Sequence, residues 1–210
     1  MPYTLATDAL VTLAQAKQEI GQLDNDPTTN DALTGLVNAS TAAVMEYAQR
    51  EFKTITTGST VRTFSILPGT TGGYVDFGRF DAQSVTVVQV DTQLAAPTTL
   101  AATDYQLVPP EKWRGVYTGL IVTGSSFPLA ASGMNMIHTA AVTGTWGWPS
   151  VPADVQRACL VTIAMWYRHE QAALSSSFQS EQDTTFTPRV VSLPFGARAL
   201  LAPYRRPSVA

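Results

Sequence analysis

The chain has 210 residues, of which 45% are hydrophobic and 14% charged, and its formal net charge is −3. This length can bury a proper core in one domain or two, and its single cysteine, Cys159, excludes an intrachain disulfide. No basic region precedes an apolar run at the N-terminus, so we expect no signal peptide. The low charge density favours assembly, because charge depletion is typical of interface cores.

Two helices are predicted near the N-terminus. Thr12 and Gln15 have the spacing of a capping box, and Gly21 suits the left-handed position after a helix end. These signals predict a short helix between Thr12 and Gly21. A second helix is predicted from about Asn30 to Glu51, where apolar residues recur at helical spacing. Its apolar stripe comprises Leu33, Leu36, Val37, Val44, Tyr47 and Ala48.

The polar residues between these helices, from Asp24 to Asn30, have the alternate spacing of a calcium-binding loop. That motif requires Gly at its sixth position and Glu at its twelfth, and the chain has Thr29 and Gly35 there. We therefore expect a solvated loop with a helix cap, and no metal site.

The composition changes from Lys53 to Gly147, where Thr, Val and Gly dominate and strand patterns recur. Short strands separated by turn signals predict an antiparallel barrel or sandwich. The expected strands are Thr60–Ile66, Tyr74–Phe80, Ser84–Val90, Tyr105–Val108, Tyr117–Val122 and Met136–Val142.

Two loops in this region are candidate contacts. The Gly-rich segment from Pro68 to Gly73 lacks the Gly-Lys-Ser/Thr ending of a phosphate loop, so we interpret it as a hairpin tip. Trp113 follows two prolines in a polar loop, where it is either an exposed contact residue or folded back on the sheet. Trp113, Gly72 and Gly73 are the residues that we expect to contact a further component.

A long helix is predicted after the sequence Trp-Gly-Trp-Pro-Ser, beginning around Pro152. Proline suits a first helical position, and Asp154 in the first turn favours the positive end of the helix dipole. Nine of the ten residues from Ala158 to Tyr167 are apolar. That run is too short to span a bilayer, which needs about 20 residues. A helix that is apolar all round is buried all round, here through Val155, Cys159, Ile163, Trp166 and Tyr167.

The C-terminal region has two parts. Residues Ala172–Thr187 are polar and low in aliphatics, so we expect them to be mobile or ordered by a partner. The segment from Leu193 to Arg206 predicts a short helix that stops before Pro203. Such a helix is marginal alone and should dock on another surface. Its predicted apolar face comprises Phe195, Ala199 and Leu200 or Leu201.

Charge is unevenly distributed along the chain. The last 27 residues carry four arginines and no acidic residue, which leaves −7 for residues 1–183. A basic end on an acidic body suits nucleic acid or an acidic surface of a neighbouring subunit. We favour the second, because the arginines are interspersed with apolar residues and nucleic-acid arms have denser basic runs.

No catalytic motif is present. The two histidines, His138 and His169, belong to no His-Glu-x-x-His pair, and the chain has no Gly-x-Ser-x-Gly elbow and no Cys-x-x-Cys pair. Cys159 lies inside the apolar helix and is interpreted as a core residue. We therefore expect no enzyme activity and no cofactor.

The order of these elements resembles the tailed-bacteriophage head–tail connector family of adaptor and head-completion proteins. The Trp-Gly-Trp-Pro-Ser-Val-Pro-Ala-Asp-Val junction and the terminal Leu-Leu-x-Pro-Tyr-Arg carry the resemblance. Small members are nearly all helical, whereas this chain resembles longer members in having a β-rich insertion. The matching pieces, Val11–Ile20, Asp31–Phe52, Gly147–Arg168 and Leu193–Arg206, cover 68 of 210 residues.

The resemblance implies an α+β fold with four parts. Residues 1–52 would form the N-terminal helices of a helical body, and residues 53–147 an inserted antiparallel β barrel or sandwich. Residues 148–175 would form the central helix, and residues 176–210 a linker and a C-terminal docking arm.

The implied function is structural. Such proteins form a ring, usually of twelve subunits, beneath the portal protein in the head–tail neck of the virion, after assembly in the host cytoplasm. The ring extends the DNA channel and provides a docking surface for the stopper or tail. Double-stranded DNA passes through the lumen without specific binding, which suits an acidic body, and no membrane is involved.

The resemblance also gives the C-terminal arm a role. Binding of the portal or a neighbouring subunit falls to Leu193, Pro194, Phe195, Arg198, Leu200, Leu201, Tyr204, Arg205 and Arg206. Deleting Leu193–Ala210 is then expected to abolish portal binding and leave the fold intact. An alternative is a β-sandwich module that binds carbohydrate or a host surface, with Trp113, Trp146 and Trp148 as an aromatic platform.

Overall fold

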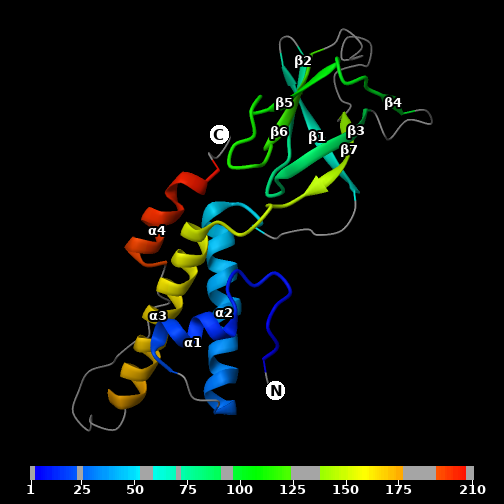
Figure 1. Ribbon diagram of the computed structural model, residues 1–210. Coiled ribbons are helices and arrows are strands. Elements are labelled where there is room, and N and C mark those ends of the chain that lie inside the picture. Colours follow the sequence, from blue (N-terminus) through cyan, green and yellow to red (C-terminus); the bar gives the residue numbers. More distant parts are fainter. Residues whose placement is uncertain are drawn as a thin grey trace. The chain divides into compact units, whose positions relative to one another are not determined.

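The computed structural model describes residues 3–22, 26–52, 59–69, 72–90, 97–123, 138–176 and 193–206. The chain folds into two compact units (Figure 1). A helical unit comprises Met1–Phe52 and Val151–Ala210, and a β unit comprises Lys53–Ser150. This arrangement confirms the α+β class with a β sheet inserted between helices.

The helical unit contains α1 (Leu13–Ile20), α2 (Pro27–Ala48), α3 (Ala153–Ser176) and α4 (Phe195–Leu201), which a short 3-10 helix (Ala202–Tyr204) continues. The predicted capping box of α1 is confirmed. The Thr12 hydroxyl accepts from the Gln15 N–H at 3.2 Å, and the Gln15 amide oxygen accepts from the Thr12 N–H at 2.8 Å. Gly21 ends the helix with a φ of 75°, as its position predicted.

α2 begins three residues before the expected Asn30, because Asp26 caps it. The Asp26 carboxylate accepts from the Thr29 backbone N–H at 2.9 Å and from the Thr29 hydroxyl at 2.8 Å. These hydrogen bonds lower the pKa of the Asp26 carboxyl. Asp24 lies outside the described residues. Within the described ranges, no group of three or more His, Cys, Asp and Glu side chains could hold a metal ion.

The β unit is one antiparallel sheet that curls into a half-barrel, with the strand order β4-β3-β7-β1-β2-β6-β5. Of the barrel and the sandwich that the sequence left open, the observed form is barrel-like. The two-residue strand β4 was not predicted, since so short a segment carries no alternation. The strands are β1 (Thr60–Gly69), β2 (Gly72–Asp76), β3 (Ala82–Val90), β4 (Thr98–Thr99), β5 (Tyr105–Val108), β6 (Gly119–Val122) and β7 (Thr139–Trp146).

An aromatic cluster fills the inside of the curled sheet. The Phe64, Phe77 and Trp146 rings lie 5.2–5.4 Å apart between centroids, and the Trp146 indole N–H donates to the Thr60 carbonyl at 2.9 Å. β3 passes close to β7 at Gly144. A Cβ there would lie 2.2 Å from the Ser84 carbonyl oxygen, so only glycine fits.

The chain leaves the sheet through a buried junction. Gly147 has a φ of 93°, a conformation that favours glycine, and its N–H donates to the Asp81 carbonyl at 2.7 Å. The Trp148 indole N–H donates to the Asp81 carboxylate at 3.0 Å. Both side chains of this pair are buried, so the junction is part of the β unit's packing. None of the helices that the structure describes is long and apolar enough to cross a membrane.

Candidate assembly surfaces

One side of α3 forms the centre of the helical unit. Val155, Cys159 and Ile163 are fully buried, and α3 packs against α1, α2 and α4. The Cys159 sulfur lies 3.1 Å from the Ser40 hydroxyl of α2. Burial raises the pKa of the Cys159 thiol, and the contact with Ser40 opposes the rise only in part. The thiol is therefore neutral at physiological pH and unsuited to nucleophilic chemistry.

The other side of α3 differs from the expectation that this helix is buried all round. Several of its apolar side chains are half-exposed in the single chain. The Trp166 indole N–H is buried without a hydrogen-bond partner among the described residues, whereas the Tyr167 hydroxyl accepts from the Gln22 amide at 3.3 Å. The half-exposed apolar residues of α3 are Leu160, Val161, Met165, Trp166 and Tyr167. At about 3.6 residues per turn these five do not share one side, but Val161 and Met165 do. The side of α3 that carries Val161 and Met165 therefore offers apolar surface to another molecule.

The C-terminal arm, residues 193–206, docks on its own chain. The Tyr204 ring packs edge-on against Phe52 with centroids 5.8 Å apart, and its hydroxyl lies 3.2 Å from the Asp154 carboxylate of α3. The Arg206 N–H donates to the Ala48 carbonyl at the end of α2 at 3.2 Å. The buried residues of the arm, Leu193, Ala197, Leu201 and Tyr204, are therefore not available to a partner in this structure.

Arg50 completes this docking, and the sequence did not single it out. It is 5% exposed, and its Nε donates to the Tyr204 carbonyl at 2.6 Å. The only sequence signal is an arginine directly after the apolar stripe of α2. Because the arm buries these groups, the structure favours destabilisation of the helical unit on deletion of Leu193–Ala210 over an intact fold.

The apolar face predicted for α4 is wrong at Phe195 and Ala199, whereas Leu201, one of its two alternative leucines, is buried. Phe195 is 88% exposed and Ala199 is exposed as well. The buried positions 193, 197, 201 and 204 follow helical spacing across the short helix, so the smaller Ala197 faces the core in place of the larger Phe195. The arm therefore presents Phe195 to solvent one helical turn from the exposed Arg198. Ala199 and Arg205 are also exposed, and Pro194, Leu200 and Arg206 are half-exposed.

The candidate contacts of the β unit are more enclosed than expected. Trp113 is half-buried and packs edge-on against Trp148 at 5.8 Å between ring centroids. Trp146 and Trp148 are each 1% exposed, so the aromatic platform of the alternative hypothesis is wrong. Gly73 is buried, and Gly72 pairs with Gly69 at the end of the β1–β2 hairpin.

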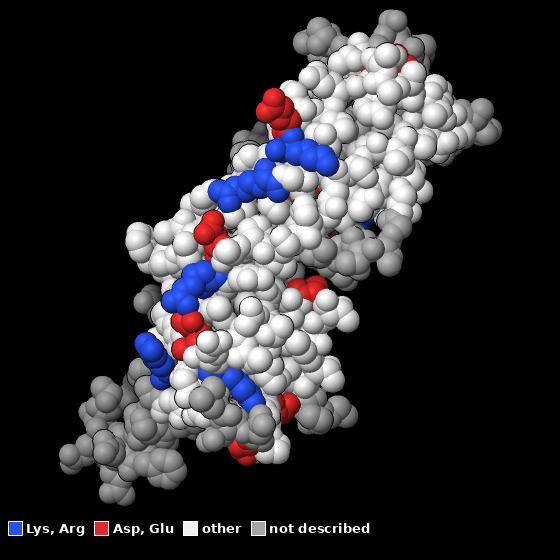
Figure 2. Space-filling view, in the orientation of Figure 1, with Lys and Arg blue, Asp and Glu red and all other residues white. Residues whose placement is uncertain are grey.

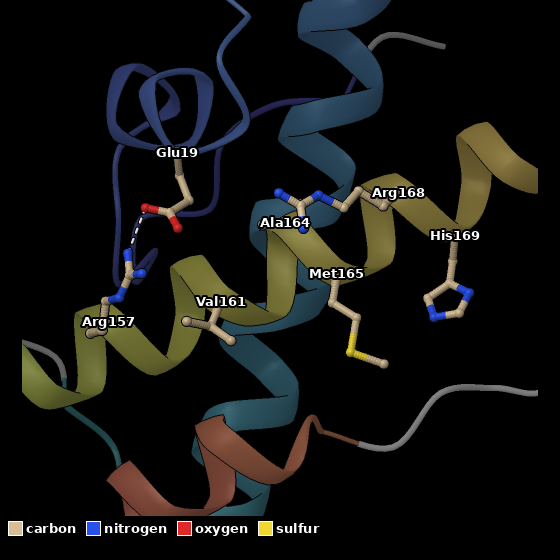
Figure 3. Close-up of a pocket in the computed structure, with 7 residues that line it drawn as sticks. All are labelled: Glu19, Arg157, Val161, Ala164, Met165, Arg168 and His169. Carbon is tan, nitrogen blue, oxygen red and sulfur yellow. Dashed lines mark hydrogen bonds and ion pairs between the residues drawn. The ribbon is translucent and has the colours of Figure 1, made fainter.

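An open groove of about 550 Å³ runs along the half-exposed side of α3 (Figure 3). Arg157 at one end forms an ion pair with Glu19 of α1 at 2.6 Å. Figure 3 shows Arg157 and Arg168 pointing to the side of α3 from which Glu19 reaches, and Met165 and His169 pointing to the other. The lining residues, Glu19, Arg157, Val161, Ala164, Met165, Arg168 and His169, combine apolar surface with basic groups.

The surface contains few charges. On the face shown in Figure 2, charged side chains are sparse, the two signs alternate, and most of the surface is uncharged. Such a surface suits contact with other protein subunits better than contact with nucleic acid, which requires concentrated positive charge.

Comparison with protein families identifies the chain. A family model described as head completion protein matches residues 9–207, which include all the helices and strands described above. The chain belongs to the head completion protein family. This finding confirms the resemblance seen in the sequence. The family consists of structural virion proteins and is not an enzyme class.

Two solved structures have a similar fold. A chain from the neck of an empty gene transfer agent particle, computed with C6 symmetry, has a TM-score of 0.53 and 17% identity; the match covers 100% of this chain and 96% of that one. A chain from the virion of a native gene transfer agent particle has a TM-score of 0.50 and 16% identity, with the same coverage. No curated protein sequence matches the chain.

Proposed function

We propose that the chain is the subunit of a head–tail connector ring, which lies beneath the portal, extends the DNA channel and provides the docking surface for the stopper or tail. The observation that carries this proposal is the family match over residues 9–207. The match spans both the helical unit and the β unit and includes every described helix and strand, which supports a connector role for both units.

The similar chain in a particle neck supports the ring. That neck was computed with C6 symmetry, and a ring of twelve subunits has a copy number compatible with a six-fold axis. The half-exposed apolar side of α3 also supports assembly, because exposed apolar surface at a groove is typical of protein contacts.

The exposed part of the C-terminal arm is proposed to contact the portal. Phe195 is 88% exposed on a helix whose other side is anchored in its own chain. A large aromatic side chain held on a rigid element loses little conformational entropy on binding, and aromatic residues and arginine are enriched at binding hot spots. Arg198, three residues later on the same helix, adds positive charge near it. The buried residues of the arm then act as the anchor, and the exposed ones as the contact.

The first prediction tests this contact. Replacing Phe195 with Asp places a charge where an apolar contact is proposed, so we expect portal binding to fall by at least about tenfold. The melting temperature should not change, because the side chain is exposed. Binding is measured by pull-down and by mass photometry with purified portal.

Val61→Asp is the matched control, since Val61 is also an exposed apolar residue, 62% exposed, but lies on β1. Unchanged portal binding by the Phe195 variant would contradict the role of the arm. The ring itself is tested on the unmodified chain by mass photometry and negative-stain imaging. A monomer both alone and with portal would contradict the connector.

A further inference from the structure

The two sides of the helical unit carry opposite charge. Residues 3–12 and 26–48, which form the N-terminal segment and α2, contain four acidic residues and no Lys or Arg. The other side, formed by α3 and the C-terminal arm, contains five arginines and two acidic residues. Figure 1 shows the N-terminal segment beside α2, on the side away from α3 and α4. The acidic residues are Asp8, Asp26, Asp31 and Glu46.

The acidic side presents two apolar side chains in a fixed position. Tyr3 is 63% exposed and Leu5 is 42% exposed. Asn38 of α2 holds the backbone on both sides of Leu5. Its amide N–H donates to the Thr4 carbonyl and its amide oxygen accepts from the Ala6 N–H, both at 2.9 Å. The segment is therefore held along α2 by hydrogen bonds while its apolar side chains remain in water. A partner that covered these two side chains would gain stability by removing apolar surface from water.

The basic side presents a complementary groove. Its floor consists of Val161, Ala164 and Met165 on α3, and Arg157 and Arg168 lie along it (Figure 3). Arg157 is paired with Glu19 at one end of the groove, so Arg168 supplies the positive charge that accompanies its apolar surface. The N-terminal segment combines apolar side chains with the negative charge of Asp8. The groove and the N-terminal segment belong to the same chain but lie on different sides of the helical unit.

We propose that the groove of α3 in one subunit binds the N-terminal segment and α2 of a second copy of this chain. Tyr3 and Leu5 cover the apolar floor, and Asp8 lies near Arg168. Because the two surfaces differ, the contact is heterologous and repeats head to tail, and such contacts form a ring when the rotation closes. This inference rests on the proposed ring and names the surfaces that build it. Exposed Ala32 and Ala39 on α2 leave room for the neighbouring chain to approach closely.

Engineered cysteines distinguish a head-to-tail contact from a symmetric one. A chain carrying both Leu5→Cys and Met165→Cys should give a ladder of disulfide-linked multimers under mild oxidation, alone or on the portal. Each single variant should stay monomeric on a denaturing gel, and a mixture of the two single variants should stop at dimers. The unmodified chain is the control for the buried Cys159.

Charge reversal gives an independent readout. Arg168→Glu and Asp8→Arg should each weaken ring assembly by about tenfold, and combining them in one chain should restore part of the loss. Circular dichroism of each variant verifies the fold. Dimers formed by a single cysteine variant, or rings that tolerate both reversals and show no ladder, would overturn this inference. If the unmodified chain forms no ring alone or on the portal, the proposed function fails instead.

Discussion

Polar side chains inside the helical unit form hydrogen bonds largely within their own helix. The Ser40 hydroxyl donates to the Val37 carbonyl at 3.0 Å, and the Thr162 hydroxyl donates to the Ala158 carbonyl at 2.8 Å. The Cys159 sulfur lies 3.1 Å from the Ser40 hydroxyl, and either group can be the donor in this contact. The α2–α3 contact can therefore include polar residues without leaving these groups unpaired.

The state of Cys159 gives a prediction at this scale. Burial raises the pKa of its thiol above the ordinary value of 9.0, so the reactive thiolate is scarce at pH 8 and the sulfur is shielded as well. We expect a thiol reagent to label the native protein at least about a thousandfold more slowly than the protein in urea, because labelling requires opening of the fold. Native labelling at the rate of a free thiol would contradict this packing.

At the scale of elements, the sequence predicted the features that depend on nearby residues, such as the ends of helices. Thr12, Gln15 and Gly21 set the ends of α1 through contacts within a few residues, so the sequence alone predicted them. The docking of α4 depends instead on Phe52 and Asp154, which are distant in the sequence. No local pattern indicates that Tyr204 contacts them, and the apolar face predicted for α4 therefore included the exposed Phe195.

The anchoring of α4 can be tested with two leucines that are neighbours in sequence. Leu201 is fully buried, whereas Leu200 is half-exposed. Leu201→Ala should lower the free energy of unfolding of the helical unit by about 2–4 kcal/mol through loss of burial and cavity formation. Leu200→Ala should lower the free energy of unfolding clearly less, because Leu200 is half-exposed. Urea unfolding followed by circular dichroism measures both, and equal effects would show that α4 is not anchored by this face.

At the scale of the whole molecule, the β unit has a core of its own. The buried cluster lies entirely between residues 66 and 146, and the strands pair with one another in one antiparallel sheet. The boundary predicted after residue 147 separates Trp148 from the sheet, although its indole N–H bonds to the Asp81 carboxylate. The end of the strand pattern is visible in the sequence. No local signal, however, indicates that Trp148 packs against the β unit that precedes it.

This packing predicts how the β unit behaves in isolation. We propose that residues 53–150 fold alone, because they contain the complete buried cluster. A fragment of residues 53–147 should be less stable by about 3–5 kcal/mol, since it lacks a fully buried tryptophan and the donor to the buried Asp81 carboxylate. Circular dichroism and urea unfolding of the two fragments measure the difference. Within residues 53–150, Trp148→Phe is the intermediate control: it keeps an aromatic ring against Trp113 and removes only the indole N–H. Equal stability of all three would mean that the junction belongs to the helical unit, where the sequence alone had placed it.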